Sequence, residues 1–464
     1  MKNPKHDIGC RLMKLLAIIL AVTPFALCWY GYFADSIPVP FFNRGNWVVI
    51  ALFAILYMSF ARVYDALWIS VNKLSELIYS QMLAVLIADA IMYIIIWLLN
   101  HYIPPIVPCL ITLAIQLCMV SFWSCLARKW YFFSFPPTKT AVVYTRRRNV
   151  TDLFHVYGLD SKFDVQLTLS PAECVNDLKQ LEGFQTVFIC DVQSHDRNVI
   201  LKYCIANGIG VYVLPRIGDI IMSGAHRMHM FHLPVLRVER RSLVPEHAFA
   251  KRLVDILFSL LGLLITSPVM LITAIAVKAH DGGPVLYRQE RLTKNGKVFK
   301  VMKFRSMRVD AEKDGKARLS TGDKDDRITP VGRIIRKVRI DELPQLLNVL
   351  SGSMSLVGPR PERPEIAAQY EEILPEFRLR LQAKAGLTGY AQVYGKYNTT
   401  PYDKLQMDLM YIANPSFLED LRIMMATIKI LFTPESTDGV TEGQTTAIEV
   451  RSEADEEELV GAGR

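Results

Sequence analysis

The order of apolar and polar residues separates a membrane part of the chain from two more polar parts. Four apolar stretches, residues 15–33, 47–64, 82–100 and 107–127, lie before residue 135. Each stretch is long enough to cross a hydrocarbon layer of roughly 30 Å as a helix. The pattern therefore predicts a membrane protein with a four-helix transmembrane bundle over residues 1–135.

Basic residues orient this bundle in the membrane. They gather before the first stretch and after the fourth: Lys2, Lys5, Arg11, Lys14, Arg128 and Lys129. The loops on the other side, residues 34–46 and 101–106, contain one arginine, Arg44. Because Lys and Arg accumulate in the cytoplasmic loops of membrane proteins, both ends of the bundle are predicted to face the cytoplasm.

The middle region, residues 136–245, alternates short apolar runs with helical stretches. Runs at 141–144, 186–190 and 210–214 have the length of buried strands, which predicts a cytoplasmic Rossmann-like α/β domain with a parallel sheet. Where a nucleotide-binding domain would have glycines after its first strand, this chain has Arg146, Arg147 and Arg148. Arginines bind phosphate, but without glycine the backbone cannot approach a pyrophosphate closely, so a structural or regulatory role is favoured.

A fifth apolar stretch, residues 253–277, contains one charged residue, Asp255, and has basic residues at both ends. Ser267 and Pro268 lie in its middle, where the proline removes a backbone hydrogen bond and bends or breaks a helix. The stretch is therefore either a re-entrant helix that returns to the cytoplasmic face or a kinked helix that crosses the membrane. The residues alone leave both alternatives open.

Residues 280–432 contain several short basic motifs. Residues 298–307 have the pattern of a strand that places Lys303 and Arg305 on one face. A helix predicted to begin at Thr329 places further basic residues on one face: Arg333, Arg336 and Lys337. Each motif alone is explained by a solvated basic surface, but together they predict an anion-binding site.

Two adjacent carboxylates, Asp341 and Glu342, follow this basic helix. Asp341 fits poorly as a helix N-cap, because Pro344 would then occupy the third helical position without an N–H group to be capped. An aspartate is ionised at pH 7 and can act as a nucleophile without a separate base. Glu342 can bind a metal or take a proton, so the pair predicts catalytic residues that also bind Mg²⁺.

Arg360 lies between two prolines in the run Gly358-Pro359-Arg360-Pro361. A residue before proline is restricted to extended geometry, so the guanidinium is presented on a stiff loop. Such a loop suits bidentate binding of a phosphate, and a merely rigid turn is the alternative.

From about residue 251 to 432 the chain resembles the monotopic phosphoglycosyl transferases of the bacterial sugar transferase family. The resemblance rests on motifs in a fixed order: Ser267-Pro268, Gly283-Pro284-Val285, Arg288-Gln289-Glu290-Arg291, Lys303-Phe304-Arg305-Ser306-Met307, Asp341-Glu342-Leu343-Pro344-Gln345, Gly358-Pro359-Arg360-Pro361 and Gly386-Leu387-Thr388-Gly389. The bundle and the middle domain are similar to those of the family's larger members. One departure is Ala385, which stands where a proline is common.

The resemblance implies a reaction. A hexose-1-phosphate, glucose or galactose, passes from a UDP-sugar to undecaprenyl phosphate and UMP is released. Asp341 matches the nucleophile that forms a phosphosugar–aspartate intermediate in a ping-pong scheme, and Glu342 matches its partner, linked to Mg²⁺ and to activation of the acceptor. Lys303, Arg336 and Arg360 match positions that bind phosphate or cofactor.

The resemblance also implies an organisation. A re-entrant helix broken at Ser267-Pro268 keeps a catalytic domain, residues 246–433, at the cytoplasmic face of the bacterial plasma (inner) membrane. There it would initiate exopolysaccharide, capsule or O-antigen synthesis, and a homodimer is possible. A scaffold or sensor without turnover is the alternative function. A flippase or multi-spanning transferase is disfavoured by the small number of crossings.

The remaining features concern the end of the chain and its overall charge. Residues 402–432 are predicted to be helical, either on the membrane surface or packed on their own domain. Residues 434–464 contain nine acidic and two basic residues and are predicted to be a disordered tail without a catalytic role. The net charge of the chain is nevertheless +8, so the other residues are strongly basic. Because no nucleic-acid-binding motif is present, this charge indicates phosphorylated substrates and an anionic membrane surface.

Overall fold

The computed structural model describes residues 4–38, 40–41, 43–100, 102–145, 159–240, 245–309, 311, 325, 327–395 and 400–431. The chain separates into two compact units, Met1–Pro215 and Arg216–Arg464. The division into four parts made from the sequence stays a prediction. The basic run at 146–148 and the acidic tail at 434–464 lie outside the described residues.

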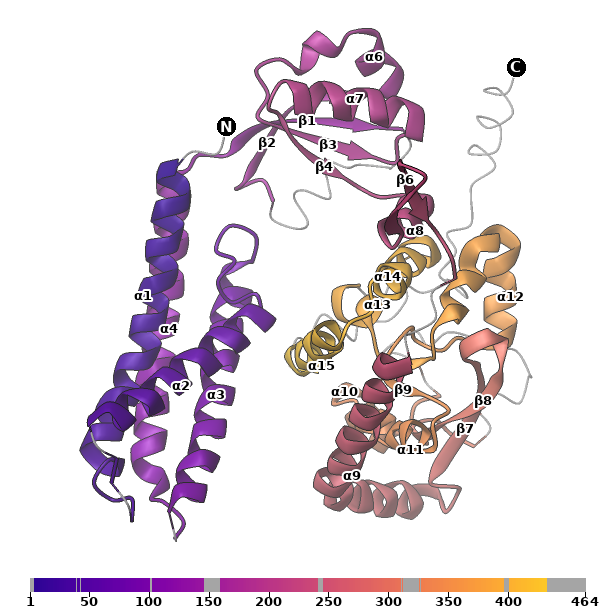
Figure 1. The fold of residues 1–464 in the computed structure, drawn as a ribbon. Helices are drawn as coiled ribbons and strands as arrows, with labels where there is room; N and C mark the ends of the chain where they lie inside the picture. The colour runs from indigo at the N-terminus through magenta and orange to yellow at the C-terminus, as the bar shows by residue number, and fades with distance from the viewer. Residues whose placement is uncertain are drawn as a thin grey trace. The chain divides into compact units, whose positions relative to one another are not determined.

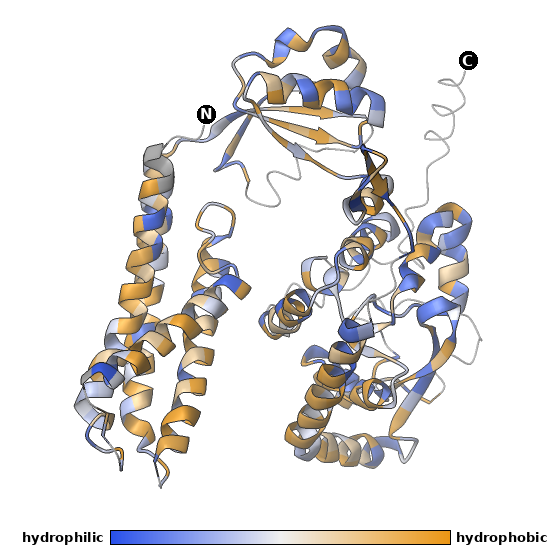
Figure 2. Cartoon of the chain, in the orientation of Figure 1, coloured by the Kyte–Doolittle hydropathy of each residue, from blue (hydrophilic) through white to orange (hydrophobic). Residues whose placement is uncertain are grey.

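The first unit begins with long apolar helices: α1 (Pro4–Cys28), α2 (Asn43–Val63), α3 (Leu74–Leu99) and α4 (Ile106–Ser134). A short π-helical turn, Trp29–Phe33, follows α1. Each helix contains most of one predicted apolar stretch, and Figure 2 shows apolar residues along all of them. Neighbouring helices pack in the pairs α1 with α2, α1 with α4, α2 with α3 and α3 with α4.

The rest of the first unit is an α/β layer. Its strands are β1 (Thr138–Tyr144), β2 (Phe163–Leu169), β3 (Thr186–Cys190) and β4 (Gly210–Val213). They form a parallel sheet in the order β2-β1-β3-β4. Figure 1 shows α6 (Pro171–Asn176) and α7 (Ser194–Ala206) on one face of this sheet. The three predicted strands are present, but β4 is a largely exposed edge strand and not a buried one as predicted. The sequence reasoning missed β2.

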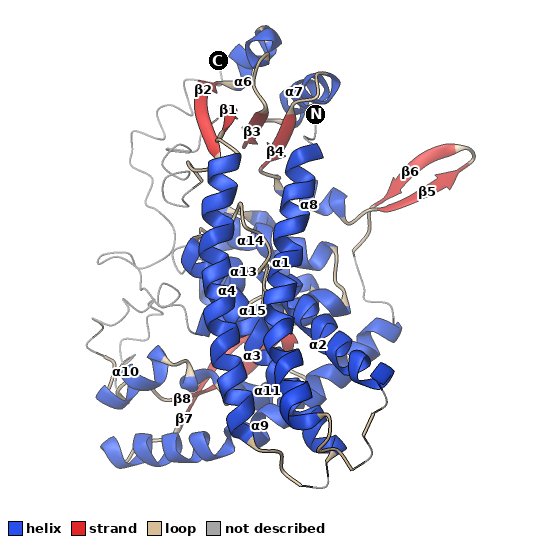
Figure 3. Cartoon of the chain, turned by 90° about the vertical axis from the view of Figure 1, so that its left-hand side faces the viewer, coloured by secondary structure: helices blue, strands red, loops and turns tan. Residues whose placement is uncertain are grey.

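The second unit contains the remaining elements. A short helix, α8 (Ile217–Ser223), precedes a hairpin of β5 (His226–Met230) and β6 (Leu233–Arg237), which extends away from the helices in Figure 3. A second hairpin pairs β7 (Leu286–Leu292) with β8 (Val298–Phe304). Two short parallel strands are β9 (Ser355–Val357) and β10 (Gly386–Thr388). The helices around them are α9 (Pro245–Asp281), α10 (Pro330–Lys337), α11 (Gln345–Ser351), α12 (Pro364–Ile373), α13 (Tyr390–Tyr394), α14 (Pro401–Ala413) and α15 (Phe417–Leu431).

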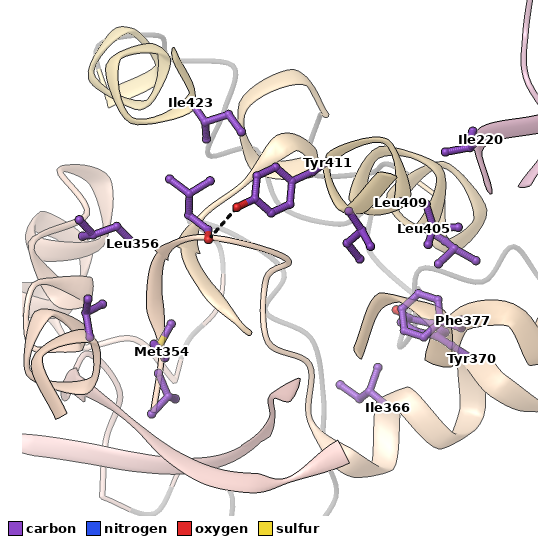
Figure 4. Close-up of a cluster of buried hydrophobic side chains, with 14 of the residues drawn as sticks. Ile220, Met354, Leu356, Ile366, Tyr370, Phe377, Leu405, Leu409, Tyr411 and Ile423 are labelled. Carbon is purple, nitrogen blue, oxygen red and sulfur yellow. Dashed lines mark hydrogen bonds between the residues drawn. The ribbon is translucent and has the colours of Figure 1, made fainter. Parts of the chain in front are cut away.

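One hydrophobic core joins residues of α8, α11, α12, α14, α15, β8 and β9, and Figure 4 shows part of it. A second cluster joins Val277 of α9, Phe304 of β8 and Ile335 of α10. Leu405, Leu409 and Tyr411 of α14 are buried in the first core with Ile423 of α15. The Tyr411 hydroxyl donates a hydrogen bond of 3.4 Å to the carbonyl of Val357 at the end of β9. Of the two interpretations of residues 402–432, packing on their own domain is therefore the one that the described helices show.

The helix α9 contains the fifth apolar stretch. It is continuous through Pro268, and Figure 1 shows it bent rather than interrupted. The Ser267 hydroxyl donates to the carbonyl of Leu264 at 2.8 Å, next to Pro268. With α1 to α4 it makes five described helices that are long and apolar enough to cross a membrane, by length and composition. Helices of this length and composition are typical of a membrane protein.

Candidate active site

Three segments of the second unit bring the predicted residues together. Lys303 lies near the end of β8, Asp341 and Glu342 lie in a 3₁₀ turn (Ile340–Glu342), and Arg360 follows β9. The turn follows α10, which begins as predicted: the Thr329 hydroxyl accepts a hydrogen bond of 2.9 Å from the amide of Gly332. Asp341 caps no helix, since α11 begins later, at Gln345.

Glu342 is the centre of the site's ion pairs. Its Oε1 accepts hydrogen bonds from Lys303 Nζ at 2.7 Å and from Arg360 Nη2 at 2.8 Å. Burial acts to raise the pKa of Glu342, but the charges of Arg360 and Lys303 outweigh it and hold the pKa well below the ordinary value. A carboxylate in this state is a weak proton acceptor, so the site favours Glu342 as a ligand for cations over Glu342 as a general base.

Asp341 is buried beside Glu342, and its environment acts in the opposite direction. Burial, with the neighbouring charge of Glu342, raises the pKa of Asp341 to about 6, although Lys303, Arg336 and Arg360 act to lower it. Among the described residues, none donates a hydrogen bond to its carboxylate. Asp341 is therefore ionised at pH 7 but poorly solvated, which is a suitable state for a nucleophile.

The loop that carries Arg360 is held against β10 by backbone contacts. Gly358 N–H donates to the Thr388 carbonyl and Gly386 N–H donates to the Pro359 carbonyl, both at 2.9 Å. A Cβ at Gly386 would lie 2.1 Å from the Gly358 nitrogen, and one at Gly389 would lie 2.2 Å from the Gly358 oxygen. These glycines are required because the two motifs touch through their backbones.

Behind the loop lies a buried ion network that the sequence reasoning missed. Arg380 is 4% exposed and donates from Nη2 to the carbonyl oxygen of Arg360 at 2.8 Å. The same guanidinium lies 2.7 Å from Asp408 Oδ2 and 3.6 Å from Glu362 Oε1. Burial alone would raise the pKa of Glu362, but Arg380 and other cations hold it below its ordinary value. The network fixes the backbone of Arg360, and no local sequence pattern marks its members.

Two further predicted features lie apart from the Glu342 ion pairs. Arg305, predicted to bind phosphate, donates from both Nη atoms to Asp281 at the end of α9 and from Nε to the Pro284 carbonyl at 2.8 Å. It is buried, and a Cβ at Gly283 would lie 2.8 Å from its Nη2. Arg305, which directly follows β8, thus connects this strand to the end of α9. Ser267 and Pro268 lie inside α9, and a proline in a helix interior bends the helix.

The departure at residue 385 has a local explanation. The amide of Ala385 donates a hydrogen bond of 3.1 Å to the hydroxyl of Thr293, next to the β9 and β10 pair. A proline at this position has no N–H group and cannot make this bond. Alanine therefore ties the strand region to the loop after β7.

The two carboxylates suit a magnesium ion shared with a substrate. Among the described residues no group of three or more His, Cys, Asp or Glu side chains forms a complete metal site. Mg²⁺, however, is commonly held by one or two carboxylates together with substrate phosphates and waters. Asp341 and Glu342 supply such a pair, and no described residue donates a hydrogen bond to the Asp341 carboxylate.

Comparison with known proteins identifies a family and several relatives of this chain. The profile of a family described as bacterial sugar transferase matches residues 246–434. An Aeromonas hydrophila UDP-N-acetylgalactosamine-undecaprenyl-phosphate N-acetylgalactosaminephosphotransferase is 37% identical over 236 residues, 50% of this chain and 55% of that protein. The Rhizobium leguminosarum bv. phaseoli exopolysaccharide production protein PSS is 43% identical over 187 residues, 38% of this chain and 92% of that protein.

A third relative extends the comparison. A Caulobacter vibrioides UDP-glucose:undecaprenyl-phosphate glucose-1-phosphate transferase is 40% identical over 191 residues, 40% of this chain and 71% of that protein. The chain spans about half the length of the Aeromonas relative, at 55%, and 92% of the Rhizobium one. The family profile covers Asp341, Glu342 and Arg360.

Proposed function

Because the chain belongs to the bacterial sugar transferase family, we propose that it transfers a hexose-1-phosphate from a UDP-sugar to undecaprenyl phosphate and releases UMP. The observation that carries the proposal is the buried Asp341 beside Glu342, whose Oε1 holds Lys303 and Arg360 together. Relatives named for glucose and galactosyl transfer support glucose or galactose as the sugar. The product would begin an exopolysaccharide, capsule or O-antigen repeat unit.

In the first step an Asp341 carboxylate oxygen attacks the phosphorus that carries the sugar. The bond from this phosphorus to the UMP oxygen breaks, and UMP leaves with the bonding electrons. In the second step a phosphate oxygen of undecaprenyl phosphate attacks the same phosphorus and releases the Asp341 carboxylate. This ping-pong scheme needs no general base, because the aspartate and the lipid phosphate are both anionic at pH 7.

The cations bind and orient the diphosphate. Arg360 has five N–H donors and Lys303 has three, so each can donate to Glu342 and to a phosphate oxygen at the same time. Arg336 lowers the pKa of Asp341 through its charge and lies on α10, next to the catalytic turn. Glu342 fixes the direction of Lys303 and Arg360 before the substrate arrives, which reduces the reorganisation needed during the reaction.

UMP release is expected to decline as the pH is lowered through about 6. The pKa of Asp341 is raised to about 6, and the protonated carboxyl formed below that pH is not a nucleophile. Replacing Arg336 by Met removes a cation that lowers this pKa, so the acidic limb should move to higher pH. The measurement is kcat/KM for UMP release between about pH 5 and about pH 8. A limb that moves to lower pH in Arg336→Met would contradict this electrostatic role.

We also propose Mg²⁺ as the cofactor, held by Asp341 and Glu342 with the diphosphate. Bound there, it would neutralise charge on the leaving phosphate. Removal of divalent cations with EDTA is expected to stop UMP release, and added Mg²⁺ should restore it. Full activity in EDTA would show that Lys303 and Arg360 suffice for charge neutralisation.

The helix α9 is proposed to be re-entrant, with the catalytic site at the cytoplasmic face of the plasma membrane. The proline in its interior, Pro268, the basic residues near both ends and its many exposed apolar side chains support this placement. Reporters inserted after Lys139 and after His280 should lie on the same side of the membrane. Reporters on opposite sides would favour a crossing helix. A homodimer stays a prediction.

A panel of UDP-sugars with purified protein, undecaprenyl phosphate and Mg²⁺ tests the function itself. Release of UMP with one sugar would identify the donor. No release with any UDP-sugar, in a protein that remains folded, would overturn the proposal.

A further inference from the structure

One face of α9 carries polar and small residues through an otherwise apolar helix. Arg252, Asp255, Ser259 and Gly262 follow one another at spacings of three, four and three, which places them on the same face. Asp255 is 4% exposed and Ser259 is fully buried. Leu257, between them in the sequence, is 55% exposed and faces elsewhere. This face contacts the catalytic elements α11 and β9.

Arg252 binds the end of α11. Its Nη1 and Nη2 donate to the carbonyls of Val349 at 2.7 Å and Leu350 at 2.8 Å, which lie in the last turn of the helix. The last carbonyls of a helix lack the regular donor four residues on, so other groups bond them. The Val349 carbonyl also accepts from the amide of Gly352 at 3.0 Å, and the guanidinium adds a donor to each of the two carbonyls. Further along the same face, a Cβ at Gly262 would lie 3.2 Å from Leu346 Cδ1, so α9 and α11 approach closely. The helix α11 continues the turn that contains Asp341 and Glu342.

Asp255 binds β9. Its Oδ1 accepts a hydrogen bond from the amide of Leu356 at 2.9 Å and another from the hydroxyl of Ser355 at 3.1 Å. A buried carboxylate is costly unless donors satisfy it, and the start of β9 supplies two. The strand β9 leads directly into the loop that presents Arg360. Two residues one turn apart in α9 therefore bind two segments of the site. One is α11, which follows the turn that carries Glu342, and the other is β9, which leads to Arg360.

We propose that Arg252 and Asp255 are positioning residues that fix the catalytic turn and the Arg360 loop relative to each other. The placement of α9, the helix proposed to enter the membrane, then directly sets the geometry of the site. A displacement of β9 against α11 would separate Arg360 from Glu342 and misalign the diphosphate with Asp341. This inference rests on the proposed function, since its effect is measured as transfer of the phosphosugar.

Asp255→Leu is the first test. It removes both acceptors of the β9 hydrogen bonds and is expected to lower kcat for UMP release by about tenfold to a hundredfold, as misplacements of about 1 Å do. Asp255→Asn keeps an amide oxygen that accepts both hydrogen bonds, so it should retain most of the activity. Leu257→Ala, on the exposed face two residues away, is the matched control and should behave as wild type.

A double-mutant cycle separates positioning from a general loss of folded protein. If Asp255 acts through the Arg360 loop, Asp255→Leu should cost much less in an Arg360→Lys background than in the wild type, because the aligned guanidinium is already lost. If Asp255 only stabilises the fold, the fold-losses in kcat of the two single variants should multiply in the double variant. Such a product, or an Asp255→Asn variant as impaired as Asp255→Leu, would overturn the inference.

A second variant, Ser355→Ala, tests the same hydrogen bonds with a smaller change. Should Asp255→Leu fail to fold, Ser355→Ala carries the same cycle, because it removes one of the two hydrogen bonds and leaves the buried carboxylate in place. Multiplication of its loss with Arg360→Lys overturns the inference as well. A folded wild type that releases no UMP would overturn the proposed function. A wild type that releases UMP, with losses that multiply, overturns the positioning role alone.

Discussion

The Asp341→Asn variant is expected to lose at least about 10³-fold in kcat for UMP release, because an amide has no anionic oxygen to attack phosphorus. The variant should stay folded. Asp341 is buried, and burial raises its pKa, so a neutral side chain of nearly the same shape removes an unfavourable charge. The loss would therefore report chemistry rather than misfolding. Both UMP release and transfer to the lipid should be measured.

Two further observations complete this test. Wild-type protein incubated with the UDP-sugar and no acceptor should gain the mass of one sugar phosphate on the peptide that contains Asp341, and Asp341→Asn should not. Glu372→Gln is a matched control, because it makes the same kind of substitution on the exposed face of α12. An Asp341→Asn variant with full UMP release would show that another residue is the nucleophile.

Local sequence patterns predicted the part of the site that local geometry determines. The adjacent carboxylates, the prolines around Arg360 and the start of α10 each have a short-range physical cause. The structure brings Lys303, Glu342 and Arg360 into contact. The alternating apolar residues of β2 (Phe163–Leu169) were also readable as a strand, although the sequence reasoning passed over them.

The contacts that could not be predicted are those between side chains far apart in the sequence. Strand periodicity predicted that Arg305 and Lys303 lie on the same face of one strand. In the structure β8 ends at Phe304, and the Arg305 side chain binds Asp281 instead. The partner belongs to α9, and no spacing rule identifies it. Arg380 lies in a polar stretch that resembles a surface, and only the packing of α14 and the Arg360 loop around it makes it a buried residue.

Replacement of Arg380 by Met is expected to destabilise the second unit by about 3–5 kcal/mol, because it leaves buried carboxylates without their cation. Asp408 Oδ2 lies 2.7 Å from the guanidinium, and Asp408 is 1% exposed. Glu362 would keep some compensation, since Arg291 lies 3.8 Å from it. The midpoint of thermal unfolding in lipid nanodiscs should fall. UMP release should fall as well, because the carbonyl of Arg360 loses its donor.

Arg378→Met is the control for this prediction, because Arg378 lies in the same 3₁₀ segment (Pro375–Gln382) and is exposed. It should unfold at the wild-type temperature. Adding Asp408→Leu to Arg380→Met should recover part of the stability, since the second substitution removes the buried carboxylate that the first leaves unpaired. The recovery should not extend to UMP release, because the Arg360 carbonyl still lacks the Arg380 donor. If Arg380→Met instead unfolds at the same temperature as Arg378→Met, water or another cation reaches the carboxylates, and the network does not hold the Arg360 loop.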